Sequence, residues 1–196
     1  MPALDLPPYQ QERVLCSVAA AVEYKIPANI VIAVAENEGG KPGQWVLNTN
    51  GTHDVGPMQF NTSYLKELAK YNITATDVAQ AGCYSFRLAA WRLRQHIMKD
   101  AGDIWTRAAN YHSRTPEHNA RYRANLKIRA AKWASWLDSR YQTVTVNAPA
   151  LTASQIAPHP HRPSWQAAHA PTVVAAFTPG HQSYTPRKLL NAGSQP

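Results

Sequence analysis

Apolar residues recur at helical spacing through most of the first 137 positions of the chain. The spacing predicts helices over residues 10–24, 28–38, 62–71, 74–80, 83–99, 104–110 and 116–137. Two of these segments have a capping residue where a helix should start, Thr74 and Asp103. Pro27 and Pro116 suit the first turn of the helices that they begin. We therefore expect an all-α domain.

A polar, turn-rich stretch at residues 39–57 interrupts the helical pattern. It is rich in Gly, Asn and Pro and has no sustained periodicity. Its Val-Leu-Asn-Thr-Asn-Gly segment predicts a short strand that ends in a turn at Asn50-Gly51. The domain is thus expected to carry one small loop or β-like excursion.

Two glutamates, Glu36 and Glu38, stand where the helix at residues 28–38 ends. The apolar run from Ile30 to Ala35 contains no Gly or Pro, so it predicts a buried helix. A helix end fixes a carboxyl group, and nearby apolar groups raise its pKa by disfavouring the charged form. This arrangement is typical of a general acid. The residues alone leave open which glutamate serves.

The composition changes after Asp138. Residues 139–196 contain no Asp or Glu and eight prolines, which predicts a disordered or extended tail. Its four histidines are irregularly spaced and favour solvated residues over metal ligands. The Pro-rich residues 1–9 are expected to be flexible. The predicted organisation is therefore a flexible 1–9, a folded 10–138 and a disordered 139–196.

Several functional classes lack the residues that they require. The chain has no GxSxG, phosphate-loop or GxGxxG motif, and no Cys or His cluster at zinc spacing, so we expect no cofactor and no metal. No run of about 18 apolar residues is present, and the start shows no signal peptide. The net charge of +8 favours anionic partners such as nucleic acid, lipid or wall polymers. The basic helix at 116–137 is interpreted as a solvated face rather than a nucleic-acid surface.

Three short motifs, in order along the chain, resemble the goose-type lysozyme and soluble lytic transglycosylase superfamily. They are Glu38 before its Gly-rich turn, the Gly-Pro-Met-Gln segment at 56–59, and Ala-Ala-Asn-Tyr at 108–111. The resemblance covers about residues 10–137 and is nearest to the conjugal-transfer (TrbN-type) subgroup of type IV secretion systems. It implies a lysozyme-like fold. It also implies a disulfide between Cys16 and Cys83, and hence an oxidising compartment such as the periplasm.

The resemblance implies a reaction as well as a fold. Residues 10–138 would cleave the β-1,4 bond between N-acetylmuramic acid and N-acetylglucosamine in peptidoglycan. Glu38 would act as the acid and then as the base, and a 1,6-anhydromuramoyl end would result. Met58, Gln59, Asn61 and Tyr111 are the implied substrate-binding residues. The tail is expected to dock components of a type IV secretion or conjugation apparatus.

Three departures from the family pattern keep alternatives open: Gly39 stands for Ser, Pro57 for Leu and His112 for Asn. Glu36 is the alternative catalytic acid. Asp54 has two interpretations. It would make the enzyme a muramidase-type hydrolase if it positioned water, or it would serve only to cap the following turn or helix. A wall-binding adaptor without turnover and a DNA-binding component of transfer are further hypotheses.

Overall fold

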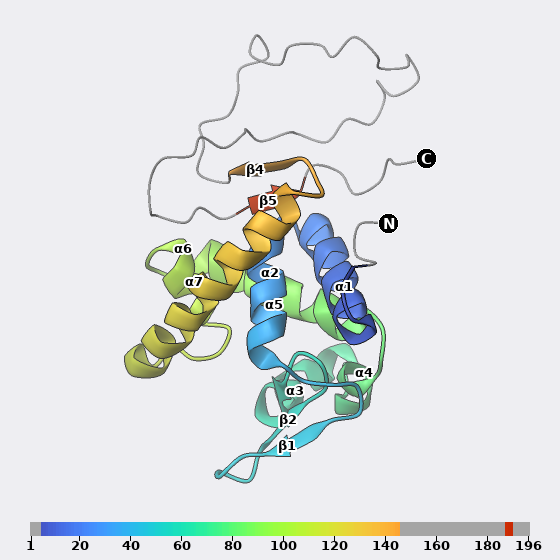
Figure 1. Cartoon of the computed structure of the whole chain (residues 1–196). Helices are drawn as coiled ribbons and strands as arrows, with labels where there is room; N and C mark the ends of the chain where they lie inside the picture. The colour runs from blue at the N-terminus through green and yellow to red at the C-terminus, as the bar shows by residue number, and fades with distance from the viewer. Residues whose placement is uncertain (1–4, 146–186, 190–196) are drawn as a thin grey trace, which may run out of the picture.

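The computed structural model describes residues 5–145 and 187–189 (Figure 1). In chain order the elements are α1 (Pro8–Tyr24), α2 (Ala28–Glu38), β1 (Trp45–Leu47), β2 (His53–Val55), β3 (Phe60–Asn61), α3 (Thr62–Leu68), η1 (Ala69–Tyr71), α4 (Ala75–Ala79), α5 (Tyr84–Lys99), α6 (Ile104–Ala109), α7 (Pro116–Asp138), β4 (Thr143–Thr145) and β5 (Arg187–Leu189). The predicted all-α, lysozyme-like fold is confirmed.

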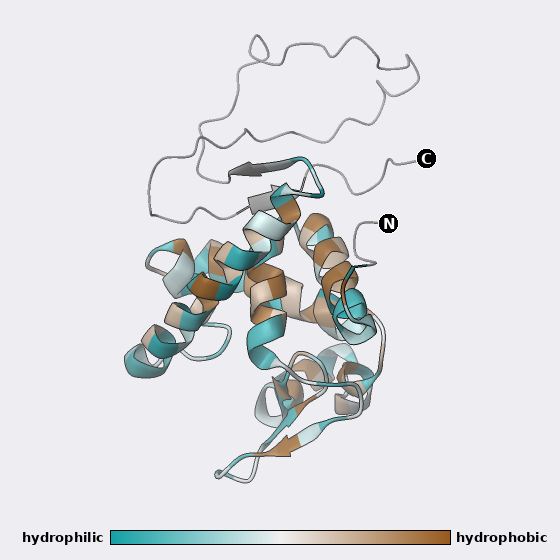
Figure 2. Cartoon of the chain, viewed as in Figure 1, coloured by the Kyte–Doolittle hydropathy of each residue, from teal (hydrophilic) through white to brown (hydrophobic). Residues whose placement is uncertain are grey.

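Helix α2 is the centre of the domain. Every residue from Ala28 to Ala35 is buried, and α1, α5 and α7 pack around it (Figures 1 and 2). The helix ends because Gly39 adopts a left-handed φ of 62°, where its N–H donates to the Ala35 carbonyl at 3.2 Å. An apolar segment buried on all sides carries the two glutamates at its end. The core therefore fixes their backbone positions.

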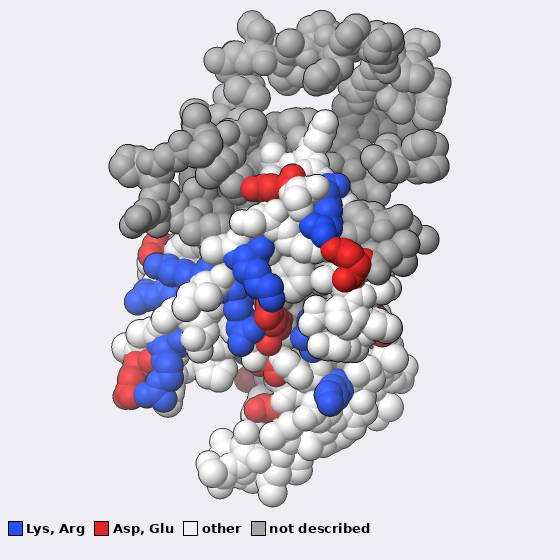
Figure 3. Space-filling model, viewed as in Figure 1, with Lys and Arg blue, Asp and Glu red and all other residues white. Residues whose placement is uncertain are grey.

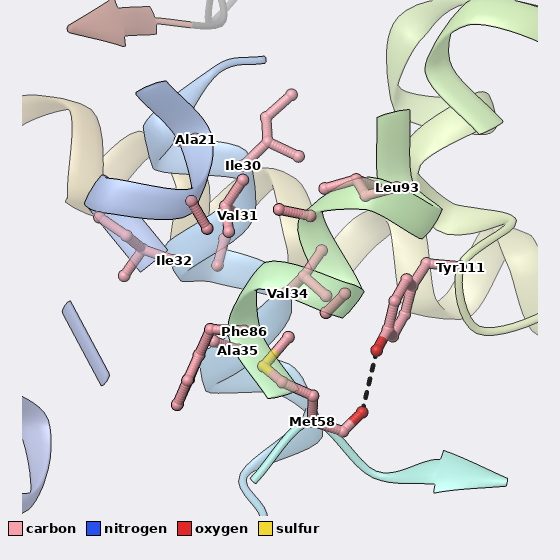
Figure 4. Close-up of a cluster of buried hydrophobic side chains, with 14 of the residues drawn as sticks. Ala21, Ile30, Val31, Ile32, Val34, Ala35, Met58, Phe86, Leu93 and Tyr111 are labelled. Atoms are coloured by element: carbon pink, nitrogen blue, oxygen red, sulfur yellow. Dashed lines mark hydrogen bonds between the residues drawn. The ribbon is translucent and has the colours of Figure 1, made fainter. Parts of the chain in front are cut away.

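The side chains of α2 meet those of the helices around it in one continuous core. Figure 4 shows Ile30, Val31 and Val34 beside Phe86 and Leu93 of α5. On the α7 side, a buried hydrogen bond of 3.2 Å from the Asn29 amide to the Ala130 carbonyl adds a polar contact. Fully burying each large aliphatic side chain contributes about 1.5–3 kcal/mol. The core thus holds both the helix and the angle at which α7 crosses it.

A small antiparallel sheet extends from the helical domain below α2 in Figure 1. Its strand order is β1-β2-β3, with Val46 opposite Asp54 and Asp54 opposite Asn61. The β1–β2 turn is closed by hydrogen bonds between residues 48 and 52. The predicted β-like excursion is confirmed. Its first strand, β1, ends at Leu47, three residues before Asn50 of the predicted turn.

The predicted disulfide between Cys16 and Cys83 is present. It joins α1 to the residue that precedes α5, with a Cα–Cα distance of 4.9 Å. A bidentate ion pair between Arg87 and Glu23 joins the same two helices, with its shorter contact at 2.8 Å. These links reinforce the side of the domain that lies away from α7.

Three elements include residues from the two ends of the chain that were predicted to be flexible or disordered. Helix α1 begins at Pro8 and so includes two residues that were predicted to be flexible. Proline suits this position because the first residue of a helix has no intrahelical hydrogen bond to lose. In the predicted disordered tail, β4 pairs antiparallel with β5, with Val144 opposite Lys188. β5 also lies against α1 and α2. The rest of the tail, with its histidines, and residues 1–4 lie outside the described residues.

A helix that crosses a bilayer needs about 20 mostly apolar residues. No helix in the described ranges has that combination of length and hydropathy.

Replacing both cysteines tests the contribution of the disulfide. A bridge that closes a loop between positions 67 apart restricts the unfolded chain, so Cys16→Ser with Cys83→Ser should lower the free energy of unfolding by about 2–4 kcal/mol. Urea unfolding followed by circular dichroism measures the loss. Reducing the parent protein should reproduce it, whereas the reductant should not affect the double variant. Equal midpoints for parent and variant would contradict the expectation.

Candidate active site

A hydrogen bond between α7 and α2 defines the candidate site. The Tyr122 hydroxyl of α7 donates to Oε1 of Glu38 at 2.6 Å, across 84 positions of sequence. Burial raises the pKa of Glu38 to about 7, against the lowering effects of the Tyr122 hydrogen bond and the Arg92 charge. Near neutral pH the carboxyl group therefore populates both protonation states. Such a group can give a proton and take one back.

Tyr122 is matched to this role by its own surroundings. Burial, followed by the negative charge of Glu38, raises the pKa of its hydroxyl well above the usual value. The hydroxyl therefore keeps its proton and can only donate to the carboxylate. Sequence reasoning does not identify this residue, since its only signal is an aromatic ring among the basic residues of α7.

Glu36 lies in a different environment from Glu38. Its Oε1 pairs with Arg129 at 2.8 Å and with Lys132 at 3.6 Å. Its Oε2 accepts a hydrogen bond of 2.5 Å from the indole of Trp133. Residues two apart on a helix do not share a face, so the two glutamates meet different parts of α7. The ion-paired Glu36 carboxylate joins α2 to α7. This arrangement favours Glu38 as the proton donor.

The basic residues of α7 are distributed between these contacts and solvent. Figure 3 shows Lys and Arg side chains gathered over this helix. The opposite side of the helix is buried through Leu126, Ala130, Trp133 and Leu137. The packing agrees with the interpretation of a solvated basic face with an apolar inner side.

The turn at residues 56–59 packs against the end of α2 at Gly40. A Cβ atom on Gly40 would lie 2.1 Å from the Gly56 carbonyl oxygen and 2.6 Å from Nε2 of Gln59, so only glycine fits. The Gln59 amide donates to that same carbonyl at 2.8 Å. The Gly-Pro-Met-Gln motif is therefore placed beside the carboxyl-bearing helix end by direct contact.

Met58 and Tyr111 support this turn from inside the core. The Met58 side chain has no exposed surface and belongs to the core. The buried Tyr111 hydroxyl donates to the Met58 carbonyl at 3.0 Å (Figure 4). The tyrosine that bonds Glu38 is therefore Tyr122 and not Tyr111. Burial, followed by the Glu38 charge, raises the pKa of Tyr111, which places Tyr111 within electrostatic reach of the acid.

Arg92 is a charged residue of the site that the sequence did not single out. Its guanidinium lies 4.1 Å from the Tyr64 ring centroid and 4.8 Å from that of Tyr111. Its positive charge lowers the pKa of Glu38 and so opposes burial. Arg92 favours the carboxylate that forms once the proton has been given.

Asp54 and Asn61 face each other across β2 and β3. The Asn61 amide nitrogen donates to Oδ1 of Asp54 and to Oγ1 of Thr52, both at 2.9 Å. The Asn61 side-chain oxygen accepts from the Ser63 N–H and so caps α3. The helix that follows, α3, is therefore capped by Asn61 and not by Asp54. The Asp54 charge raises the pKa of Glu38, so the two carboxyl groups interact.

The substrate-binding residues inferred from the resemblance lie around one loop. Gln59 and Asn61 are half-buried and hydrogen-bonded within that loop, whereas Met58 and Tyr111 are buried. Direct contact of any of the four with substrate stays a prediction.

Comparison with known proteins agrees with this geometry. Residues 16–132 match the Transglycosylase SLT domain family. The chain belongs to this family of lytic transglycosylases, which are lyases that cleave peptidoglycan. The superfamily resemblance is thus confirmed.

Two relatives are proteins of enteric bacteria. The invasion protein IagB of Salmonella typhimurium strain LT2 is 29% identical over 118 residues, which cover 60% of this chain and 71% of that protein. The protein IpgF of Shigella flexneri is 31% identical over 101 residues, which cover 51% of this chain and 66% of that protein.

Removing the Tyr122 hydroxyl tests its effect on Glu38. In the parent protein the Tyr122 hydrogen bond lowers the Glu38 pKa. Its loss in Tyr122→Phe should therefore raise that pKa above about 7. If Glu38 starts the reaction as the protonated acid, the fall of kcat/KM at alkaline pH should move to higher pH. A hydrogen bond to a charged group contributes about 1.5–3 kcal/mol, so the maximum rate should drop by roughly 10–100-fold.

Tyr71→Phe is the matched control, since it removes the same hydroxyl from an exposed ring on η1. Peptidoglycan turnover measured from about pH 5 to about pH 9 gives the pH–rate profiles of both variants. An unchanged or lowered alkaline limb in Tyr122→Phe would contradict the assignment.

Proposed function

We propose that Glu38 is the single acid and base of a non-hydrolytic cleavage of peptidoglycan. The protonated carboxyl group gives its proton to the oxygen of the β-1,4 bond between N-acetylmuramic acid and N-acetylglucosamine. The carboxylate then takes the proton of the muramic acid C6 hydroxyl as that oxygen bonds to C1 and closes a 1,6-anhydro ring. The observation that carries this proposal is the half-buried Glu38–Tyr122 pair, whose acid has a pKa of about 7.

Tyr122 and Arg92 support the second half of the reaction. Each stabilises the negative charge that remains on Glu38 after the first proton transfer. Burial acts in the opposite direction and keeps the acid protonated at the start. The balance allows one carboxyl group to serve twice, without the second carboxylate that ordinary glycosidases use.

The substrate groove is proposed to run over the end of α2 and the loop at residues 44–59. Gln59 and Asn61 would present amide groups to sugar hydroxyl and acetamido groups. Met58 and Tyr111 would shape the floor of the groove from beneath, because their side chains are buried. The net charge of +8 suits an anionic wall polymer.

The biological role is proposed from the relatives and from the disulfide. One relative is named an invasion protein, and the motifs resemble a conjugal-transfer subgroup. Local opening of the wall for a conjugal-transfer or type IV secretion apparatus fits both. The Cys16–Cys83 disulfide suits an oxidising compartment, which supports a periplasmic location. Docking to the apparatus would use residues 139–196.

A muramidase-type hydrolase is the second candidate, and Asp54 favours it. Its charge acts on Glu38, and its carboxylate is oriented by the Asn61 amide. An Asp54-positioned water would then attack the sugar in place of the C6 hydroxyl. The products differ by one water molecule, so mass analysis of digested wall fragments separates an anhydromuramoyl end from a reducing end.

Amide substitutions of the two glutamates test the assignment. Glu38→Gln cannot transfer the proton, and turnover should fall by about 10²–10⁴-fold. Glu36→Gln keeps the shape of the other side chain and removes its ion pairs, so turnover should persist while the unfolding midpoint drops. Zymography on peptidoglycan and mass spectrometry of released fragments measure both.

The outcomes separate the candidate functions. Loss of turnover only in Glu36→Gln would reverse the assignment. Reducing ends that disappear in Asp54→Asn would establish the hydrolase. A folded parent protein that binds peptidoglycan without cleaving it would favour the wall-binding adaptor.

A further inference from the structure

His112 forms a flat stack on the tyrosine that bonds the candidate acid. Its ring lies 4.7 Å from the Tyr122 ring, centroid to centroid, with 5° between the two planes. Tyr122 in turn donates to Glu38 at 2.6 Å. His112 is exposed to solvent, and the Tyr122 side chain on which it stacks is half-buried. One ring therefore covers a face of the hydrogen-bonding partner of Glu38.

The turn that carries His112 is fixed to α7 by a buried side chain. The Asn119 amide donates to the Asn110 side chain at 2.7 Å, and to the carbonyls of Thr106 at 3.0 Å and Ser113 at 3.2 Å. Asn119 lies one turn before Tyr122 on α7 and is only 5% exposed. The contacts set the distance between the turn and the tyrosine without any help from the stack itself.

The neighbouring residue fixes the other side of the same turn. The Tyr111 hydroxyl bonds the Met58 carbonyl inside the core, whereas the adjacent His112 ring lies on Tyr122. The backbone N–H of His112 donates to the Ala109 carbonyl at 3.1 Å. The ring is thus held at a defined place, as a supporting group for a catalytic pair requires.

We propose that His112 is a supporting residue whose ring keeps water off the Tyr122–Glu38 pair. The proposal rests on the function assigned to Glu38 and extends it to a residue that touches neither the acid nor the reacting atoms. The planar ring is the active feature, and its nitrogens make no required contact.

The charges around His112 agree with a covering role. Burial lowers its pKa, and the charges of His118 and Arg92 lower it further, against the raising effect of Asp54. The ring is therefore neutral at pH 7. A neutral ring covers the site without adding a positive charge, which would stabilise the Glu38 carboxylate and reduce the fraction of Glu38 that is protonated near neutral pH.

The test compares three substitutions by their effect on the Glu38 pKa. His112→Ala removes the ring and admits water, so the pKa should fall from about 7 toward its ordinary value, by about one unit. His112→Phe keeps a planar ring and should leave the pKa and kcat near those of the parent. His112→Asn replaces the ring by a smaller polar side chain and should have the same effect on the Glu38 pKa as His112→Ala.

The pKa is measured directly on the full-length chain. Carbon-13 NMR of labelled glutamate carboxyl groups follows Glu38 through a pH titration, and the missing signal in Glu38→Gln assigns it. Because this readout needs no turnover, it tests the inference even if the proposed reaction is not observed. His118→Ala, which removes a nearby charge but not the stack, is the control and should leave the Glu38 titration unchanged.

The direction of the shift decides the outcome. Tyr122→Phe should raise the Glu38 pKa and His112→Ala should lower it, so the two substitutions act in opposite directions. A Glu38 pKa that is unmoved or raised in His112→Ala and His112→Asn would overturn the proposal. So would a His112→Phe variant with a parent-like pKa and a KM increased tenfold or more, since that would assign His112 to substrate contact through its nitrogens.

Discussion

The hydrogen bond from Tyr122 to Glu38 depends on the packing of α7 against α2, and the chemistry of the site depends on it in turn. A carboxyl group at the end of a buried helix would be a poor reagent if it were fully hydrated or fully neutralised. Burial raises its pKa, and the tyrosine hydroxyl and the charge of Arg92 limit the rise. The outcome is an acid that can release and recover a proton near neutrality.

The two glutamates at the end of α2 have different partners on α7. Glu36 lies against Arg129, Lys132 and Trp133, so its charge is neutralised and serves to join two helices. Glu38 meets a neutral hydroxyl instead. Both residues meet α7, and the difference between their partners assigns them different tasks.

The loop beside the site is built from contacts that leave little freedom. Gly40 allows the backbone near Gly56 and the Gln59 amide to approach the end of α2 closely. Tyr111 holds the Met58 carbonyl from the core side. A groove assembled over such a loop would be preorganised, which is how binding energy is directed to the reaction rather than to ordering the protein.

The sequence predicted the helices from their periodicity, because burial of one apolar face leaves a local record along the chain. It also located the acidic helix end and, by resemblance, the disulfide and the family. It named Tyr111 through its motif and did not name Tyr122, because motif order carries no information on where a hydroxyl points. It did not foresee the β4–β5 pair, since strands separated by 41 residues leave no local pattern.

What only the tertiary structure decided was which side chains meet. Tyr122 reaches Glu38 across 84 positions, and Trp133 reaches Glu36 across 97. These pairings follow from the angle and register at which α7 crosses α2. Local spacing fixes the face that a residue occupies on its own helix. The crossing geometry is set by the packing of many core side chains together, and so no single segment of the sequence encodes it.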